Sequence, residues 1–137
     1  MSRESVKIIE GCYASFAKGD VMTVLAAMDP QIVWSEAETF SYADGSPYIG
    51  PQAVLSGVFA RVGGDWDGFT IVPDELLDAG DTVVMRGRYQ GVFRATGVRV
   101  NAQAVHVFKL RDGKITQFQQ YADTAQLRDA MAQRASA

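Results

Sequence analysis

The chain has 137 residues, of which 47% are hydrophobic and 21% charged, and its net charge is −3. One domain over residues 1–137 is expected, because a chain of this length buries roughly 70% of its unfolded surface. The acidic balance, without a lysine or arginine cluster, argues against a nucleic-acid partner. One cysteine, Cys12, excludes an internal disulfide, and with one histidine, His106, no metal site is indicated.

The first part of the chain predicts two helices. Apolar residues recur at helical spacing from Val6 to Phe16, and Gly19 follows where a C-terminal glycine cap is typical. Asp20 is the expected N-cap of a short second helix, VMTVLAAM, which must end before Pro30. The opening segment MSRESVKIIEG lacks a long apolar core, so neither a signal peptide nor a membrane span is predicted. A soluble, cytoplasmic protein without a membrane partner is the expectation.

A strand, a loop and a third helix follow. The segment QIVWSEAE (31–38) begins with β-favouring residues, and residues 41–46 have the composition of a loop. Pro51 opens a helix over 52–62, at the position where a missing N–H costs least, and Gly63 is expected to end it.

The second half predicts four strands and a last helix. Pro73 confines the first strand to an edge or a bend, and an amphipathic helix is expected from about Thr124. The strands are FTIVPDELLDAG (69–80), DTVVMRGRYQGVF (81–93), VRVNAQAVHVFKLRD (98–112) and KITQFQQYAD (114–123). This order of elements predicts an α+β fold in which helices pack on one face of a curved antiparallel meander. A strongly curved sheet around helices leaves a conical cavity, where a functional site is expected.

His106 is the first candidate for chemistry. Strand alternation places it on one face with Phe108 and Leu110, whereas Lys109 and Arg111 mark the opposite face as the wetter one. An imidazole that lines the cavity can donate to an oxyanion or shuttle a proton. The alternative is a buried neutral histidine that bonds to a backbone carbonyl or another side chain.

Three carboxylates are candidates for the pocket, and among them Glu36 and Asp123 are candidates for a general base. Glu36 and Glu38 share a face with Trp34 if the strand is regular, and a desolvated one would have a raised pKa. Both could instead be solvated at the rim of the sheet. Asp123 is either a pocket residue or the N-cap of the last helix, a role that Thr124 could also take.

Two irregularities leave alternatives open. Regular alternation from Ile115 places Tyr121 and Asp123 on one face, but the apolar set that includes Phe118 breaks this alternation, so a bulge is a second interpretation. Gly87 and Gly91 lie two positions on either side of Tyr89, so side chains are missing on both sides of it in the strand. The missing side chains either make room for a ligand or allow the strand to bend. The aromatic residues expected to line the pocket are Tyr13, Phe16, Trp34, Phe59, Trp66, Tyr89, Phe108 and Tyr121.

Four segments of the sequence resemble the nuclear transport factor 2-like superfamily: YASFAKGD, DPQIVW, YIGPQAV and HVFKLRDGKITQFQQYAD. Within this superfamily the chain is most similar to the SnoaL-like and ketosteroid-isomerase-related members. This resemblance covers nearly the whole chain. It implies a cone-shaped, cystatin-like α+β barrel, in which a strongly curved antiparallel sheet wraps around N-terminal helices. It also implies an apolar pocket, usually in a homodimer joined through the sheet.

The resemblance also implies roles for residues. In ketosteroid-isomerase-like members a carboxylate on the first strand is the base, which corresponds here to Glu36, and a donor on the penultimate strand corresponds to His106. The tyrosine of that oxyanion hole falls nearer Cys12, with Tyr13 one step away. In cyclase members an aspartate near the end of the sheet acts with a nearby histidine, and Asp123 is compatible with this role. The middle strand lacks the acid of the epoxide hydrolase triad.

The first interpretation is therefore a cofactor-independent enzyme of the isomerase or cyclase type, with lyase and hydrolase activities left open. It would transfer a proton next to a carbonyl in an apolar pocket, using His106, Glu36 and Asp123, on a small apolar or carbonyl-containing ligand. The second interpretation is a non-catalytic module of the same fold that binds a small ligand or a protein partner.

Overall fold

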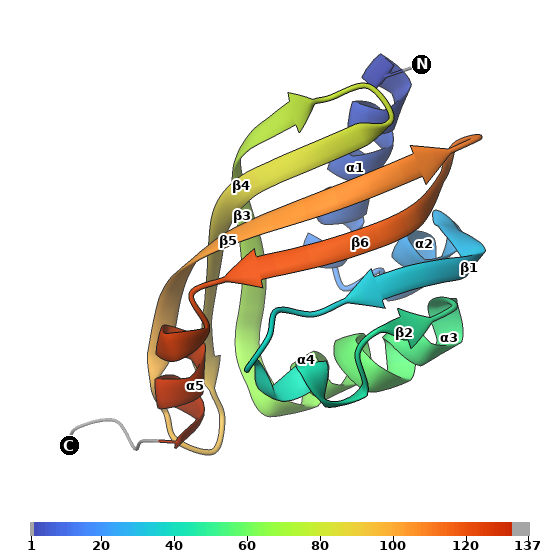
Figure 1. Cartoon of the computed structure of the whole chain (residues 1–137). Coiled ribbons are helices and arrows are strands. Elements are labelled where there is room, and N and C mark those ends of the chain that lie inside the picture. Colours follow the sequence, from blue (N-terminus) through green and yellow to red (C-terminus); the bar gives the residue numbers. More distant parts are fainter. Residues whose placement is uncertain (1, 133–137) are drawn as a thin grey trace.

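Most of the sheet is a four-stranded antiparallel meander, as the sequence predicts. The computed structural model describes residues 2–132, so positions 1 and 133–137 of the expected domain lie outside it. The strands are β3 (Trp66–Asp78), β4 (Thr82–Phe93), β5 (Arg99–Arg111) and β6 (Lys114–Ala122). They pair in sequence order, and Figure 1 shows them curving around the N-terminal helix.

Two further strands extend the meander beyond β6 and correct one expectation. The full order is β2-β1-β6-β5-β4-β3, in which β1 (Met28–Ser35) runs parallel to β6 and the short β2 (Tyr48–Ile49) runs antiparallel to β1. The sheet is thus mixed rather than wholly antiparallel. A parallel pair needs a long crossover connection, and here the chain between β1 and β6 contains helical segments and four strands, β2 to β5. Residue alternation within β1 reveals its faces but not its partner.

The two N-terminal helices form as predicted. Helix α1 (Ser2–Ala17) ends at a turn in which Gly19 has a φ of +79°. Helix α2 (Val21–Ala26) begins at Asp20, whose carboxylate accepts a hydrogen bond from the Thr23 backbone N–H at 3.2 Å. Helix α1 packs against β3 and β4 behind the sheet in Figure 1. The cavity lies between this helical layer and the concave face of the sheet.

The third predicted helix is a continuous helical segment with a π-helical turn in its middle. It comprises α3 (Pro51–Val54), the π-helical Leu55–Phe59 and α4 (Ala60–Asp65), and so extends just past the expected end at Gly63. The expected loop before it contains a short 3₁₀ helix, Ser41–Gly45. The π-helical turn brings Phe59 into the wall of the cavity.

Gly87 is explained by a close approach of two strands, which decides between the two interpretations of this glycine. A Cβ atom at this position would lie 2.3 Å from the carbonyl oxygen of Val72 and 3.0 Å from the Cα of Pro73. The register of β3 against β4 shifts between Pro73 and Glu75, and β3 is an edge strand, as the proline predicts. The missing side chain therefore accommodates the bend in β3 rather than a ligand.

Helix α5 (Thr124–Ala132) closes the described part of the chain and packs on β5. Its N-terminus is capped by Asp123, whose Oδ1 accepts from the Gln126 backbone N–H at 3.1 Å. No helix among residues 2–132 is long and apolar enough to cross a membrane.

The close approach at Gly87 makes a stability prediction. Gly87→Ala must push β3 away from β4, and we expect it to lower the free energy of unfolding by about 1–3 kcal/mol, as overpacking does. Urea denaturation measures the change. Gly11→Ala is the matched control, because nothing lies within 4 Å of its added Cβ and alanine favours the helix there. An equal loss in both variants would contradict the explanation.

Candidate functional site

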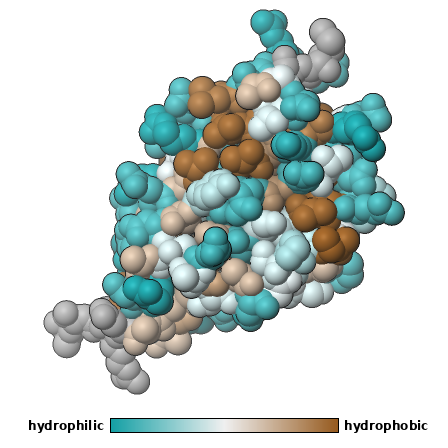
Figure 2. Space-filling view, viewed as in Figure 1, coloured by the Kyte–Doolittle hydropathy of each residue, from teal (hydrophilic) through white to brown (hydrophobic). Residues whose placement is uncertain are grey.

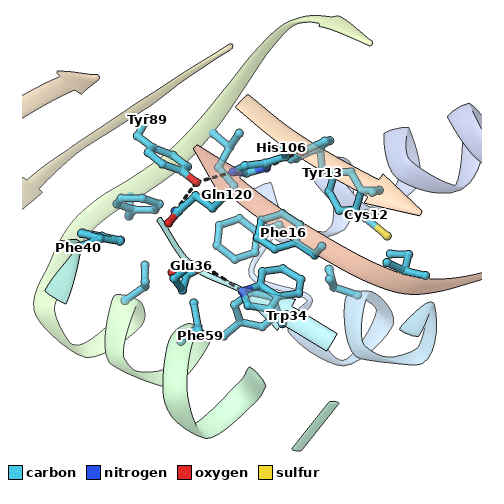
Figure 3. A pocket seen from close by; sticks show the side chains of 18 residues that line it. Cys12, Tyr13, Phe16, Trp34, Glu36, Phe40, Phe59, Tyr89, His106 and Gln120 are labelled. Carbon is cyan, nitrogen blue, oxygen red and sulfur yellow. Dashed lines mark hydrogen bonds between the residues drawn. The ribbon is translucent and has the colours of Figure 1, made fainter. Parts of the chain in front are cut away.

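The cavity is apolar and small. It lies between α1, α2, the π-helical turn and the concave face of the sheet, and the space in which the centre of a water molecule can lie measures about 70 Å³. Six of the eight aromatic residues expected to line the pocket do so (Figure 3): Tyr13, Phe16, Trp34, Phe59, Tyr89 and Phe108. Further lining residues that the sequence did not single out include Phe40, Phe69, Phe118 and Gln120.

Trp66 and Tyr121 lie outside the cavity, which corrects two of the sequence predictions. Trp66 is buried elsewhere in the core, where its Nε1–H donates to the Tyr42 hydroxyl at 3.1 Å. Tyr121 is 56% exposed on the outer face of the sheet. The inward positions of β6 are instead Phe118 and Gln120.

A bulge in β6 causes this exchange of faces. On β5, Leu110 pairs with Ile115 and the adjacent Lys109 pairs with Gln117, so Thr116 is an extra residue in β6. One extra residue inverts the alternation beyond it, because strand side chains alternate with a period of two. The bulge interpretation of the sequence is therefore the correct one.

Glu36 is the buried acid of the cavity. It follows the last residue of β1, is only 5% exposed, and accepts a hydrogen bond at Oε2 from the Trp34 Nε1–H at 2.9 Å. Burial raises its pKa from 4.5 to about 7, whereas the Trp34 hydrogen bond and the positive charge of Arg61 act to lower it. Near neutral pH this carboxyl is therefore close to half ionised. Glu38 is exposed, because the strand and its alternation end at Ser35.

His106 lies on the cavity side of β5, as its strand pattern predicts, and is 3% exposed. Its Nδ1 is 2.7 Å from the Tyr13 hydroxyl, and its Nε2 hydrogen-bonds to the Tyr89 hydroxyl. Burial lowers its pKa from 6.5 to about 3, so the imidazole is neutral at pH 7. Both ring nitrogens have tyrosine partners, so a ligand in the cavity meets these hydroxyls rather than a free imidazole nitrogen.

Gln120 is the polar residue that sequence reasoning missed. Its Nε2 donates to the Tyr89 hydroxyl at 2.7 Å, and its Oε1 accepts from the Ala37 backbone N–H at 2.9 Å (Figure 3 shows the bond to Tyr89). The sequence contains Gln117, Gln119 and Gln120 close together, and only the bulge at Thr116 determines which of them points inward.

Asp123 lies outside the cavity wall. Its carboxylate accepts two hydrogen bonds from Gln126 at the N-terminus of α5. One comes from the backbone N–H to Oδ1, and the other from the side-chain Nε2 to Oδ2 at 3.3 Å. The three predicted catalytic residues thus separate: Glu36 and His106 line one cavity, and Asp123 is a helix cap.

The charge of the cavity depends on Glu36. No lysine or arginine is among the described lining residues, and burial raises the pKa of the Cys12 thiol to about 11, which keeps it protonated. The pKa values of the Tyr13 and Tyr89 hydroxyls are also raised by burial, so both remain neutral donors.

Comparison with known proteins places the chain in a family. The model of the SnoaL-like domain matches residues 9–118, and the chain belongs to this family. A search of curated proteins finds no match.

Solved structures share the fold. A nuclear transport factor 2-like protein from Burkholderia thailandensis is 36% identical, with a TM-score of 0.87, covering 92% of this chain and 95% of that chain. A nuclear transport factor 2-like protein of unknown function from Burkholderia pseudomallei is 23% identical, with a TM-score of 0.86 and coverages of 93% and 97%. A protein named as a SnoaL-like polyketide cyclase, from Jannaschia sp. CCS1, is 16% identical, with a TM-score of 0.81 and coverages of 95% and 92%.

The raised pKa of Glu36 makes the stability of the protein depend on pH. The folded carboxyl holds its proton to about pH 7 and the unfolded one to 4.5, so its contribution is fully present below the unfolded pKa and lost as the pH rises. Glu36→Gln removes this loss. Between about pH 4.5 and pH 7, the unfolding free energy of the wild type is expected to fall relative to that of the variant, by up to about 3 kcal/mol.

Denaturant unfolding of both proteins from about pH 4 to pH 8 measures this difference. The opposite dependence that the lowered pKa of His106 produces is common to both proteins and cancels. Glu38→Gln controls for the loss of one negative charge, because it removes an exposed carboxylate. A difference between Glu36→Gln and wild type that is constant with pH would show that Glu36 is not desolvated.

Proposed function

We propose that the protein is a small-molecule enzyme that transfers a proton next to a carbonyl group without a cofactor. The observation that carries this proposal is the desolvated Glu36 carboxyl, which shares an apolar cavity with two neutral tyrosine hydroxyls held by His106. A base whose pKa lies near 7 suits proton abstraction at neutral pH, because it is ionised yet still basic.

The chemistry follows from these groups. Ionised Glu36 takes a proton from the carbon beside the carbonyl, and the electron pair of that C–H bond moves to the carbonyl oxygen, forming an enolate. A tyrosine hydroxyl beside His106 donates a hydrogen bond to this oxygen, in a site where low polarity strengthens the bond. Return of the proton from Glu36 to a different carbon is isomerisation. In a cyclisation the enolate carbon forms a bond to the carbon of a second carbonyl, whose oxygen becomes an alkoxide and takes the proton back from Glu36. His106 holds the donors, in place of the direct contact expected from the sequence.

The cavity favours a neutral ligand of about one ring. One water needs roughly 10–15 Å³ on this measure, so the cavity of about 70 Å³ takes on the order of five waters, the space that a benzene-sized molecule fills. Among residues 2–132 no lysine or arginine lines the cavity to neutralise a carboxylate or phosphate on the ligand, and an ionised Glu36 would repel it. A larger polycyclic substrate would require the wall to open.

The second candidate is a module that binds such a ligand without transforming it. It is favoured by the engagement of Asp123 as a helix cap and by the occupation of both His106 ring nitrogens. The two candidates differ in whether Glu36 removes a proton from the bound ligand.

Exchange of α-protons for deuterium in ring-sized neutral ketones distinguishes the two candidates. For the enzyme, we expect a rate that rises with pH as Glu36 ionises, half-maximal at about pH 7, and a loss of about 10²–10⁴-fold in Glu36→Gln. Glu38→Gln controls for charge and retains the rate. Binding of these ketones, detected by thermal stabilisation, without any exchange would support the binding module instead.

The second part of the proposal is that the protein forms a homodimer through the outer face of the sheet. Exposed large apolar side chains occur on four of its strands, and Figure 2 shows separate groups of apolar surface on the face turned away from α1. The exposed apolar residues on strands are Val33, Ile49, Val72, Leu77 and Tyr121. Exposed apolar side chains on a sheet face are often covered in an oligomer, and a second copy packed on the sheet is the cover that we propose.

Sedimentation equilibrium tests this dimer. Leu77→Lys places a charge on the face and is expected to weaken dimerisation at least about tenfold. Met22→Lys is the matched control, because Met22 is 69% exposed on α2, away from the sheet. A monomeric wild type at micromolar concentration, or equal weakening by both variants, would contradict a dimer through this face.

A further inference from the structure

The cavity contains a chain of hydrogen bonds whose starting direction is fixed by the backbone. The Ala37 N–H can only donate, so the end of the Gln120 amide that lies 2.9 Å from it is the oxygen. The Gln120 nitrogen is then the end that faces the Tyr89 hydroxyl, at 2.7 Å. Gln120 and Tyr89 are both buried, and both lie at the wall of the cavity.

The donor and acceptor roles fixed at Gln120 also fix those of Tyr89 and His106. The Tyr89 oxygen accepts from Gln120, which leaves the hydrogen of its own hydroxyl for the partner on its other side, the His106 Nε2. A nitrogen that accepts carries no hydrogen, and a neutral imidazole has one N–H. The neutral His106 must then carry its hydrogen on Nδ1 and donate it to the Tyr13 oxygen, 2.7 Å away.

The chain ends at Tyr13. Among the hydrogen bonds of residues 2–132, the Tyr13 side chain has the bond to His106 and no acceptor for its own hydrogen. Tyr13 also lines the cavity, and its ring stacks on the His106 imidazole at an interplanar angle of 17°. Its hydroxyl hydrogen is therefore the one that remains for a ligand.

We infer that Gln120 and Tyr89 are positioning residues that hold His106 as the Nδ1–H tautomer. His106 is the third positioning residue: it donates to the Tyr13 oxygen, so that the Tyr13 hydroxyl hydrogen points to the oxygen of the ligand. The part that concerns the ligand rests on the proposed carbonyl chemistry, whereas the tautomer does not. In the reverse arrangement Tyr89 would accept two hydrogen bonds, Tyr13 would donate to Nδ1, and Tyr89 would be the donor to the ligand.

The tautomer can be observed directly. His106 is the only histidine of the chain, so a long-range ¹⁵N–¹H spectrum of the uniformly labelled protein contains one imidazole pattern. At pH 7 we expect a protonated Nδ1 and an unprotonated Nε2. An Nε2–H tautomer, or rapid exchange between the two, would overturn the inference whether or not the protein is an enzyme.

Gln120→Glu reverses the chain at nearly constant volume. An ionised carboxylate offers acceptors to both Ala37 and Tyr89, so the Tyr89 hydroxyl turns toward it, accepts from Nε2–H, and Tyr13 donates to Nδ1. We expect the tautomer to switch at a pH where the ¹³C shift of the new carboxyl shows it to be ionised. Gln119→Glu, one residue away and pointing outward, is the matched control and keeps the wild-type tautomer. An ionised carboxyl without a switch would overturn the inference.

The exchange assay separates this inference from the proposed function. If exchange occurs, Tyr13→Phe is expected to lower kcat by about 10²–10³-fold, and Gln120→Glu to lower it because Tyr13 no longer donates to the ligand. A full kcat in Tyr13→Phe would overturn the role of Tyr13. A wild type with the Nδ1–H tautomer and no exchange would leave the chain standing and reject the enzyme.

Discussion

The bulge at Thr116 is the constraint on which the polar part of the cavity depends. One extra residue in β6 turns Phe118 and Gln120 inward and Tyr121 outward. Without it, the inward positions beyond Ile115 would be Gln117, Gln119 and Tyr121, and Gln120 would have no access to Tyr89. The bulge thus supplies both an aromatic wall beside Trp34, whose ring centroid is 3.6 Å from that of Phe118, and the amide that orients the hydrogen-bond chain.

Desolvation is the second organising effect, and it acts in opposite directions on the two titratable groups. The same apolar surroundings raise the pKa of Glu36 to about 7 and lower that of His106 to about 3. Both shifts favour the neutral form, because charge is costly in a medium of low polarity. An imidazole that stays neutral over the physiological range serves as a fixed hydrogen-bonding bridge, while Glu36 is the group whose ionisation changes the cavity near neutral pH.

Local patterns in the sequence were sufficient for most of the fold and for part of the site. The caps at Gly19 and Asp20, the edge position of Pro73 and the inward face of His106 each depend on short-range geometry, and the structure confirms them. The parallel pairing of β1 with β6 could not be predicted in the same way, because it joins segments about 85 residues apart.

The same limit explains the residues of the site that were missed. Gln120 matters through a bond to the Ala37 backbone, which a distant loop provides. Asp123, in contrast, has the helix-capping role that was one of its two predicted roles, and this role depends on local geometry.

The composition of the cavity implies how a ligand would be selected. The side-chain amide, the imidazole and the Trp34 N–H already have protein partners. Apart from the weakly hydrogen-bonding Cys12 thiol, few groups remain to recognise a ligand: the Glu36 carboxyl and one tyrosine hydroxyl hydrogen. A ligand with a single carbonyl oxygen and an adjacent C–H satisfies both, whereas additional polar groups would be buried without partners at a cost of about 1–3 kcal/mol each. For the proposed ligand, shape and the scarcity of polar contacts, rather than a dense set of hydrogen bonds, would therefore set the specificity of this site.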